Sequence, residues 1–135
     1  MKISTIFQDD WVGVRSNDRE FECVDVSQVV DAIDRLNGKN HTLVILTLDD
    51  GTMMNIGGGN DGLYVVHVAI DIDRELFNLV DPTKSPEAVV DVVAGGQAGE
   101  YPARQAVDKD TVIRAAREFA VNGTMSSELT WESQS

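Results

Sequence analysis

The sequence predicts an α+β fold, with a mostly antiparallel β-sheet, two main helices packed on it, and a single domain spanning residues 1–135. Three observations lead to this prediction. A chain of 135 residues is long enough to bury a sizeable core in one domain. Runs rich in β-branched residues alternate with turns of hairpin length. Two further segments place apolar residues at helical spacing.

The strands follow from periodicity and turn chemistry. The run from Thr42 to Leu48 leads into Asp49-Asp50-Gly51, whose Asp-Gly pair favours a tight hairpin. The segment from Leu63 to Ile70 is apolar enough to be central and covered on both faces, and a meander is the simplest topology. The other strands are expected in the weak patterns of residues 1–10 and 11–25 and at Thr52 to Ile56, Glu75 to Val80, Ala88 to Val93 and Leu129 to Glu132.

Two helices are expected from their caps and apolar stripes. Ser27 or Asp25 caps the first helix and Gly38 ends it, whereas Asp108 or Asp110 caps the second. Asn122-Gly123 closes the second helix. The apolar stripes are Val29, Val30, Ile33 and Leu36 in the first helix and Val112, Ala115, Ala116, Phe119 and Ala120 in the second.

The chain is strongly acidic. It has 23 Asp and Glu residues against 11 Lys and Arg residues, for a formal net charge of −12. This charge argues against unaided binding to nucleic acid or to a membrane surface, and a basic partner is its natural complement. Residues 46–90 carry half of the excess. An acidic surface also serves solubility alone, so the charge by itself does not define a function.

Targeting signals and disulfides are not predicted. No segment approaches the roughly 20 apolar residues of a membrane-spanning helix. Residues 1–10 reach acidic positions before a signal-peptide hydrophobic region develops, so a cytoplasmic location is expected. Cys23 is the only cysteine and is expected to be a small buried hydrophobe.

Glycine-rich segments are predicted to be structural. The segment from Gly57 to Gly62 resembles a phosphate loop, but a strand follows it and the Lys-Ser or Lys-Thr pair is missing, so a flexible hairpin loop is the better interpretation. Gly95 and Gly96 are expected to provide a positive φ or close backbone packing at a turn.

The sequence predicts no catalytic residue, no cofactor and no metal. His41 and His67 lack Cys or carboxylate partners at zinc-ligand spacing, and no Ser-His-Asp or Cys-His set can be assembled. Asp71 and Asp73 would lie on one side of an extended strand, as half of a calcium or magnesium site or as a solvated edge. Surface binding is therefore favoured over chemistry.

The order of these segments resembles immunity protein family 1 of bacterial polymorphic toxin systems. The resemblance covers residues 40–132 and rests most on the turn Gly95-Gly96-Gln97, on Tyr101-Pro102, and on the terminal Leu129-Thr130-Trp131-Glu132. It implies a small α+β protein, encoded beside a toxin with a deaminase-superfamily domain, that binds this toxin and silences it in the producing cell.

The predicted function is neutralisation of a cognate nucleic-acid deaminase by occlusion of its basic active-site cleft. The acidic loops of the middle third are expected to make the contact, with an aromatic residue in support, although an aromatic side chain near the end of an element is also typical of the core. The predicted partner-binding residues are Asp49, Asp50, Asp61, Asp71, Asp73, Glu75, Tyr101 and Trp131.

Two other functions stay open at this level. One is a small metal-dependent enzyme that uses Asp71 and Asp73, for which a divalent metal would bind saturably. The other is an adaptor domain that self-associates through a sheet edge and would form a stable homo-oligomer without a partner.

Overall fold

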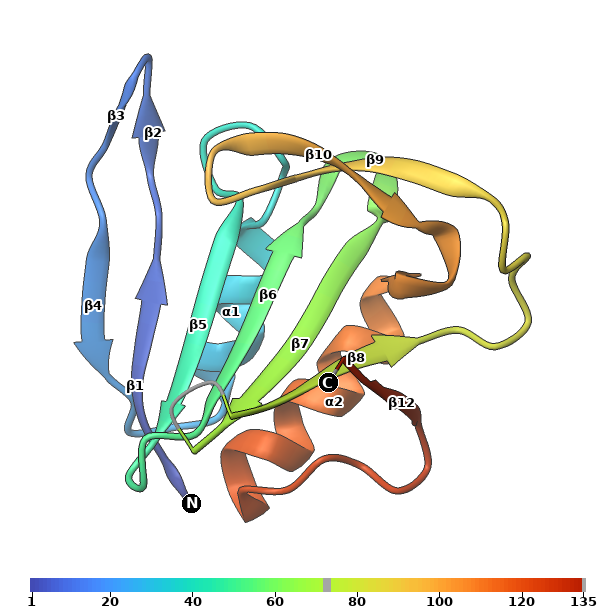
Figure 1. The fold of residues 1–135 in the computed structure, drawn as a ribbon. Helices are drawn as coiled ribbons and strands as arrows, with labels where there is room; N and C mark the ends of the chain where they lie inside the picture. Colours follow the sequence, from blue (N-terminus) through green and yellow to red (C-terminus); the bar gives the residue numbers. More distant parts are fainter. Residues whose placement is uncertain (72–73, 135) are drawn as a thin grey trace.

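The computed structural model describes residues 1–71 and 74–134 (Figure 1). Within these ranges the helices are α1 (Ser27–Arg35) and α2 (Lys109–Asn122), and η1 (Asn60–Gly62) and η2 (Ala103–Gln105) are single 3-10 turns. The strands are β1 (Ile3–Gln8), β2 (Trp11–Val12), β3 (Arg15–Ser16), β4 (Arg19–Glu22), β5 (Leu43–Leu48), β6 (Met53–Gly58), β7 (Tyr64–Ile70), β8 (Glu75–Val80), β9 (Val89–Ala94), β10 (Gln97–Pro102), β11 (Ala106–Val107) and β12 (Thr130–Ser133).

The main sheet is antiparallel throughout. Its strand order is β12-β8-β7-β6-β5-β1-β4, and β11 pairs with the free part of β7. The predicted meander is present from β5 to β8, joined by short turns (Figure 1). The last strand, β12, returns to the edge beside β8. The α+β fold class with two helices on a mostly antiparallel sheet is confirmed.

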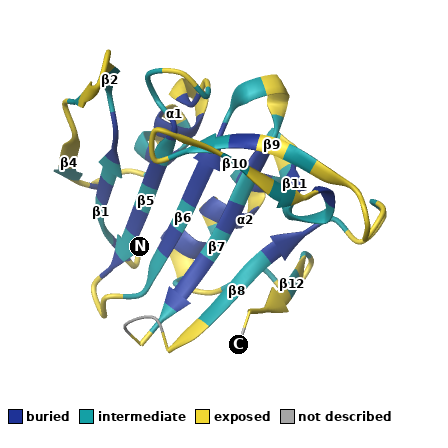
Figure 2. Ribbon diagram, turned by 45° about the horizontal axis from the view of Figure 1, so that its top comes forward, coloured by how far each residue is buried: buried dark blue, intermediate teal, exposed yellow. Residues whose placement is uncertain are grey.

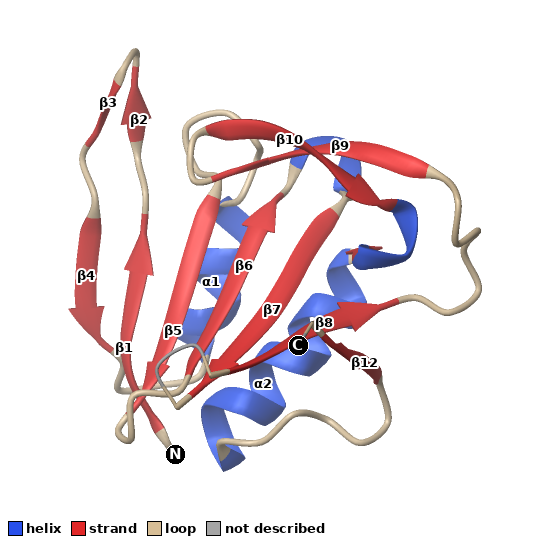
Figure 3. Ribbon diagram, viewed as in Figure 1, coloured by secondary structure: helices blue, strands red, loops and turns tan. Residues whose placement is uncertain are grey.

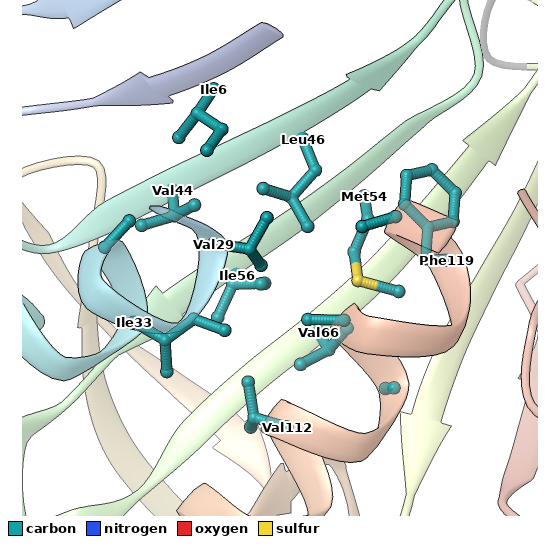
Figure 4. Close-up of a cluster of buried hydrophobic side chains, with 14 of the residues drawn as sticks. Ile6, Val29, Ile33, Val44, Leu46, Met54, Ile56, Val66, Val112 and Phe119 are labelled. Atoms are coloured by element: carbon teal, nitrogen blue, oxygen red, sulfur yellow. The ribbon is translucent and has the colours of Figure 1, made fainter. Parts of the chain in front are cut away.

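Both helices pack on the same face of the main sheet (Figure 3). Ile33 of α1 and Phe119 of α2 meet Leu46, Met54 and Ile56 of the sheet in one hydrophobic cluster (Figure 4). These side chains are at most 1% exposed, and burying each one contributes about 1.5–3 kcal/mol relative to leaving it in water. This cluster fixes which face of the sheet is covered by the helices.

The opposite face of the sheet is only partly covered. Burial alternates along β5 and β7, with buried residues towards the helices and half-buried residues on the other side (Figure 2). The expectation that Leu63 to Ile70 is covered on both faces is therefore wrong for Val65 and His67, which are half-buried. The strand is central in the sheet, but no helix covers its second face.

The helix ends match the predictions at α2 and differ at α1. Asp108 caps α2, accepting a 2.8 Å hydrogen bond from the Thr111 backbone N–H, and Gly123 ends α2 with a φ of 73°. In α1 the N-cap is Val26, without a side-chain bond, and the helix ends before Gly38. Asp25 and Ser27 bond to each other instead, 2.5 Å apart. Within the described ranges, neither helix has the length and apolarity needed to cross a membrane.

The hairpin formed by β9 and β10 leaves the main sheet. The strand expected at Ala88 to Val93 is present as β9, and it pairs only with β10, in a separate two-stranded sheet. Strand β10 was not predicted, because Gln97-Ala98-Gly99-Glu100 lacks β-branched residues. The hairpin runs across the ends of β5, β6 and β7 (Figure 1).

Candidate partner-binding surface

We call the face of the main sheet that the helices do not cover the open face. Strand register aligns Phe7, Ile45, Asn55, His67 and Asn78 in one row across β1, β5, β6, β7 and β8. Residues two positions along each strand share this face. All five side chains in the row are half-buried.

The β9–β10 hairpin closes one end of the open face. A cleft of about 320 Å³ lies there, and Leu43, Val65, Leu76 and Asn78 of the sheet line it together with Tyr101 of the hairpin. The lining combines apolar side chains with amide groups such as that of Asn78. A surface that is concave at one end and open along the rest suits a protruding element of a partner.

Close packing at two glycines lets the hairpin cross β6. A Cβ atom on Gly57 would lie 2.5 Å from the Cβ of Ala94, and one on Gly58 would lie 3.0 Å from the Val92 Cγ1 of β9. Asn60 then holds β9 through both ends of its amide, donating to the Asp91 carbonyl and accepting from the Val93 N–H. The prediction of a flexible loop is corrected, because Gly57 and Gly58 are part of β6 and are packed.

A buried carboxylate anchors the other side of the hairpin. Asp9 is 3% exposed and accepts hydrogen bonds from the Thr42 N–H (2.7 Å), the Leu43 N–H (3.0 Å) and the Trp11 indole N–H (2.8 Å). The Thr42 hydroxyl also donates to it. These bonds compensate the cost of burying the charge.

The hydrogen-bonded residues Asp9, Trp11, Thr42 and Leu43, which we call the Asp9 group, contact the β9–β10 hairpin at its turn. The Thr42 hydroxyl oxygen accepts a 2.8 Å hydrogen bond from the Gly96 N–H. The Trp11 ring lies so close to Gly96 that a Cβ there would come within 2.3 Å of it. The prediction that Gly95 and Gly96 provide a positive φ or close packing at a turn is confirmed, because both have positive φ and Gly96 is also closely packed. Nothing in the sequence around Asp9 indicates its burial, because Thr42 lies 33 positions away.

The predicted acidic residues are split between two ends of the sheet. Asp49 and Asp50 lie in the turn between β5 and β6, and Asp71 and Glu75 flank the turn between β7 and β8 at the same end. Asp73 lies outside the described residues. Backbone and side-chain hydrogen bonds from Thr52 hold the pKa of Asp50 below its usual value, which keeps it charged. Asp71 pairs with Arg74 at 3.8 Å, and both are exposed.

The other predicted residues lie elsewhere. Asp61 is at the opposite end of the sheet, in η1, with a φ of 56°. Tyr101 lines the cleft under the hairpin. Trp131 packs against the core on the helix side, and its indole N–H donates to the Ser126 carbonyl at 3.0 Å. The structure brings four of the acidic residues to one end and separates them from Asp61 and Trp131.

In the part of the chain that the structure describes, no three His, Cys, Asp or Glu side chains are grouped to hold a metal ion. Burial raises the pKa of the Cys23 thiol, which makes it a poor nucleophile and fits its predicted place in the core.

Comparison with protein families identifies the lineage. The family model of the immunity protein Imm1 matches residues 17–133. The chain belongs to the Imm1 family. The match confirms the resemblance and extends it beyond residues 40–132, to include β4, α1 and nearly the whole open face. Imm1 proteins have an immunity function against a toxin. No curated protein matches the chain. Asp9 and Trp11 precede the matched region of this Imm1 protein.

Proposed function

We propose that this Imm1 protein neutralises a nucleic-acid deaminase toxin by binding it one to one in the cytoplasm and occluding its active-site cleft. The observation that carries the proposal is the net charge of −12 on a member of a toxin-immunity family. Enzymes that act on nucleic acid line their substrate clefts with cations, because the phosphate backbone dominates binding. An acidic protein therefore competes with the substrate for the same cleft.

The acidic turns supply the electrostatic part of this binding. Asp49, Asp50, Asp71 and Glu75 lie at one end of the sheet, and all but Glu75 lie in turns between strands. Their carboxylates attract a basic cleft at long range and speed the encounter. We include Asp73 in the same set from its place in the sequence.

Inhibition of the deaminase is the direct test. The chain is co-expressed with the toxin domain encoded beside it, and host survival, co-elution on a sizing column and base deamination by the purified complex are measured. We expect survival, a co-eluting pair and loss of deamination. A folded chain that neither rescues the host nor co-elutes would contradict the proposal, and so would a neutralised toxin of another chemistry.

Charge reversal tests the acidic turns. The double substitution Asp49→Lys with Asp71→Lys should weaken toxin binding by roughly 10-fold or more, because each reversal turns attraction into repulsion. The matched control is Asp31→Lys with Glu128→Lys, which makes the same change in net charge on the helix side. Equal affinities of the two double variants would exclude a special role for the turns.

A further inference from the structure

We propose that the open face is the surface on which the toxin docks, and that it receives a protruding toxin segment with an apolar centre and Lys or Arg side chains on both flanks. This inference rests on the proposed function and specifies the surface and the chemistry of the partner. It is carried by the order of residues in one cross-strand row and by the lack of Lys and Arg at the described strand positions of this face.

The row of the open face ends in a carboxylate on each side. Register extends it from Phe7 to Glu20 of β4 and from Asn78 to Glu132 of β12, and both glutamates are exposed. A carboxylate therefore stands at each end of the row. Between them lie the half-buried apolar side chains of Phe7 and Ile45, followed by the polar side chains of Asn55, His67 and Asn78. A partner complementary to this order is basic at its flanks and apolar or hydrogen-bonding in the middle.

Among the described residues, the positions of β4, β1, β5, β6, β7, β8 and β12 that point away from the helices include no Lys or Arg. At its rim, Arg104 pairs with Glu132 at 3.4 Å. The helix side carries Arg35, Lys109, Arg114 and Arg117. The helices also carry the carboxylates Asp31, Asp34, Asp110 and Glu118, so the open face is distinguished by the lack of Lys and Arg at its described strand positions and not by a difference in sign.

The centre of the open face has unused hydrogen-bonding capacity. The side-chain amide of Asn55 has no hydrogen-bond partner within the described ranges, although it lies half-buried between Ile45 and His67. An amide in that position can donate to and accept from the backbone of a docked segment. The hairpin, held by the Asp9 group and by Asn60, forms a wall against which that segment ends.

Substitutions on the open face test the proposal. Ile45→Arg and, separately, Asn55→Arg should each weaken toxin binding by roughly 100-fold and abolish rescue of the host, because each places a bulky cation where the apolar or hydrogen-bonding centre of the docked segment is expected to lie. The matched control is Val121→Arg on α2, where the replaced side chain is 42% exposed and faces away from the sheet. Urea denaturation of each variant verifies that it is folded.

A further variant with two substitutions leaves the half-buried centre of the row unchanged. Glu20→Lys with Glu132→Lys changes only exposed positions at the two ends of the row, and we expect a loss of affinity of roughly 10-fold or more. If wild type protects the host and these folded variants bind and protect equally well, the docking surface is elsewhere and the proposed function stands. If wild type itself fails to bind a deaminase, the proposed function fails. A stable dimer of the free chain that Ile45→Arg dissociates would show that a second copy covers this face, and would overturn the docking proposal.

Discussion

Asp9 shows how one buried side chain organises a distant part of this protein. Its carboxylate accepts bonds from the backbone of Thr42 and Leu43 and from the indole of Trp11. Thr42 in turn accepts from the turn of the hairpin at Gly96. Removing one partner of a buried charged network costs more than the network contributes net, because the remaining groups lose their partners without regaining water.

We expect Asp9→Asn to lower the free energy of unfolding by about 2–3 kcal/mol, because an amide nitrogen would then face donors such as the Thr42 hydroxyl and the Trp11 indole. Urea denaturation measures the change. Asp10→Asn is the control, since its side chain is half-exposed and should change stability by less than about 0.5 kcal/mol. Equal effects of the two substitutions would contradict the anchoring role of Asp9.

Gly57 packs too closely against Ala94 to leave room for a side chain. Gly57→Ala should destabilise the fold by about 1–3 kcal/mol, since its Cβ would lie 2.5 Å from that of Ala94. Ala94→Gly in the same chain should recover part of the loss by removing the clashing atom. Gly99→Ala is the control, because its nearest contact is an ordinary 3.5 Å to Tyr101. A double variant no more stable than Gly57→Ala would rule out this contact as the cause.

At the scale of the element, α2 depends on its N-cap. The free backbone N–H groups of its first turn are satisfied in part by Asp108, which the sequence indicates through an acidic residue just before an apolar stripe. Asp108→Ala should cost about 1 kcal/mol of stability, whereas Asp108→Asn should cost little, because asparagine is an equally good cap. Urea denaturation at neutral pH distinguishes the two, and equal losses would show that capping is not the cause.

The same cap has a pH dependence with a defined sign. Hydrogen bonds from Thr111, first from its hydroxyl and then from its N–H, lower the pKa of Asp108 below its usual value. Its stabilisation is therefore complete above the unfolded pKa of about 3.9 and is lost as pH falls through the lower folded pKa. The stability difference between wild type and Asp108→Ala should shrink as the pH is lowered through this range. A constant difference would contradict the assignment.

At the scale of the whole molecule, the net charge of −12 is expected to speed association with a basic toxin. The rate constant for binding the toxin should fall by about tenfold or more as salt rises from about 50 mM to about 500 mM, because screening shortens the range of attraction. The dissociation rate should change less. Stopped-flow mixing measures both rates. The proposed electrostatic encounter would be wrong if the association rate were independent of salt.

The sequence by itself determined the features that depend on neighbouring residues. The run of β-branched residues from Thr42 to Leu48, the Asp-Gly turn and the Asp108 cap are local, so the α+β class, the meander and α2 could be predicted from such features. The resemblance to an immunity family came from short motifs in the last third, and the family match confirms it. The excess of acidic over basic residues follows from counting residues in the sequence and does not depend on the fold.

Only the tertiary structure decided which surface is available to a partner. The row from Glu20 to Glu132, the crossing of β9 over Gly57 and the burial of Asp9 each join residues that are far apart in the chain. Periodicity shows that a strand has two faces, but not which face the helices will cover. That choice follows from packing among all the elements together, because the apolar stripes of both helices must be buried against one side of the sheet.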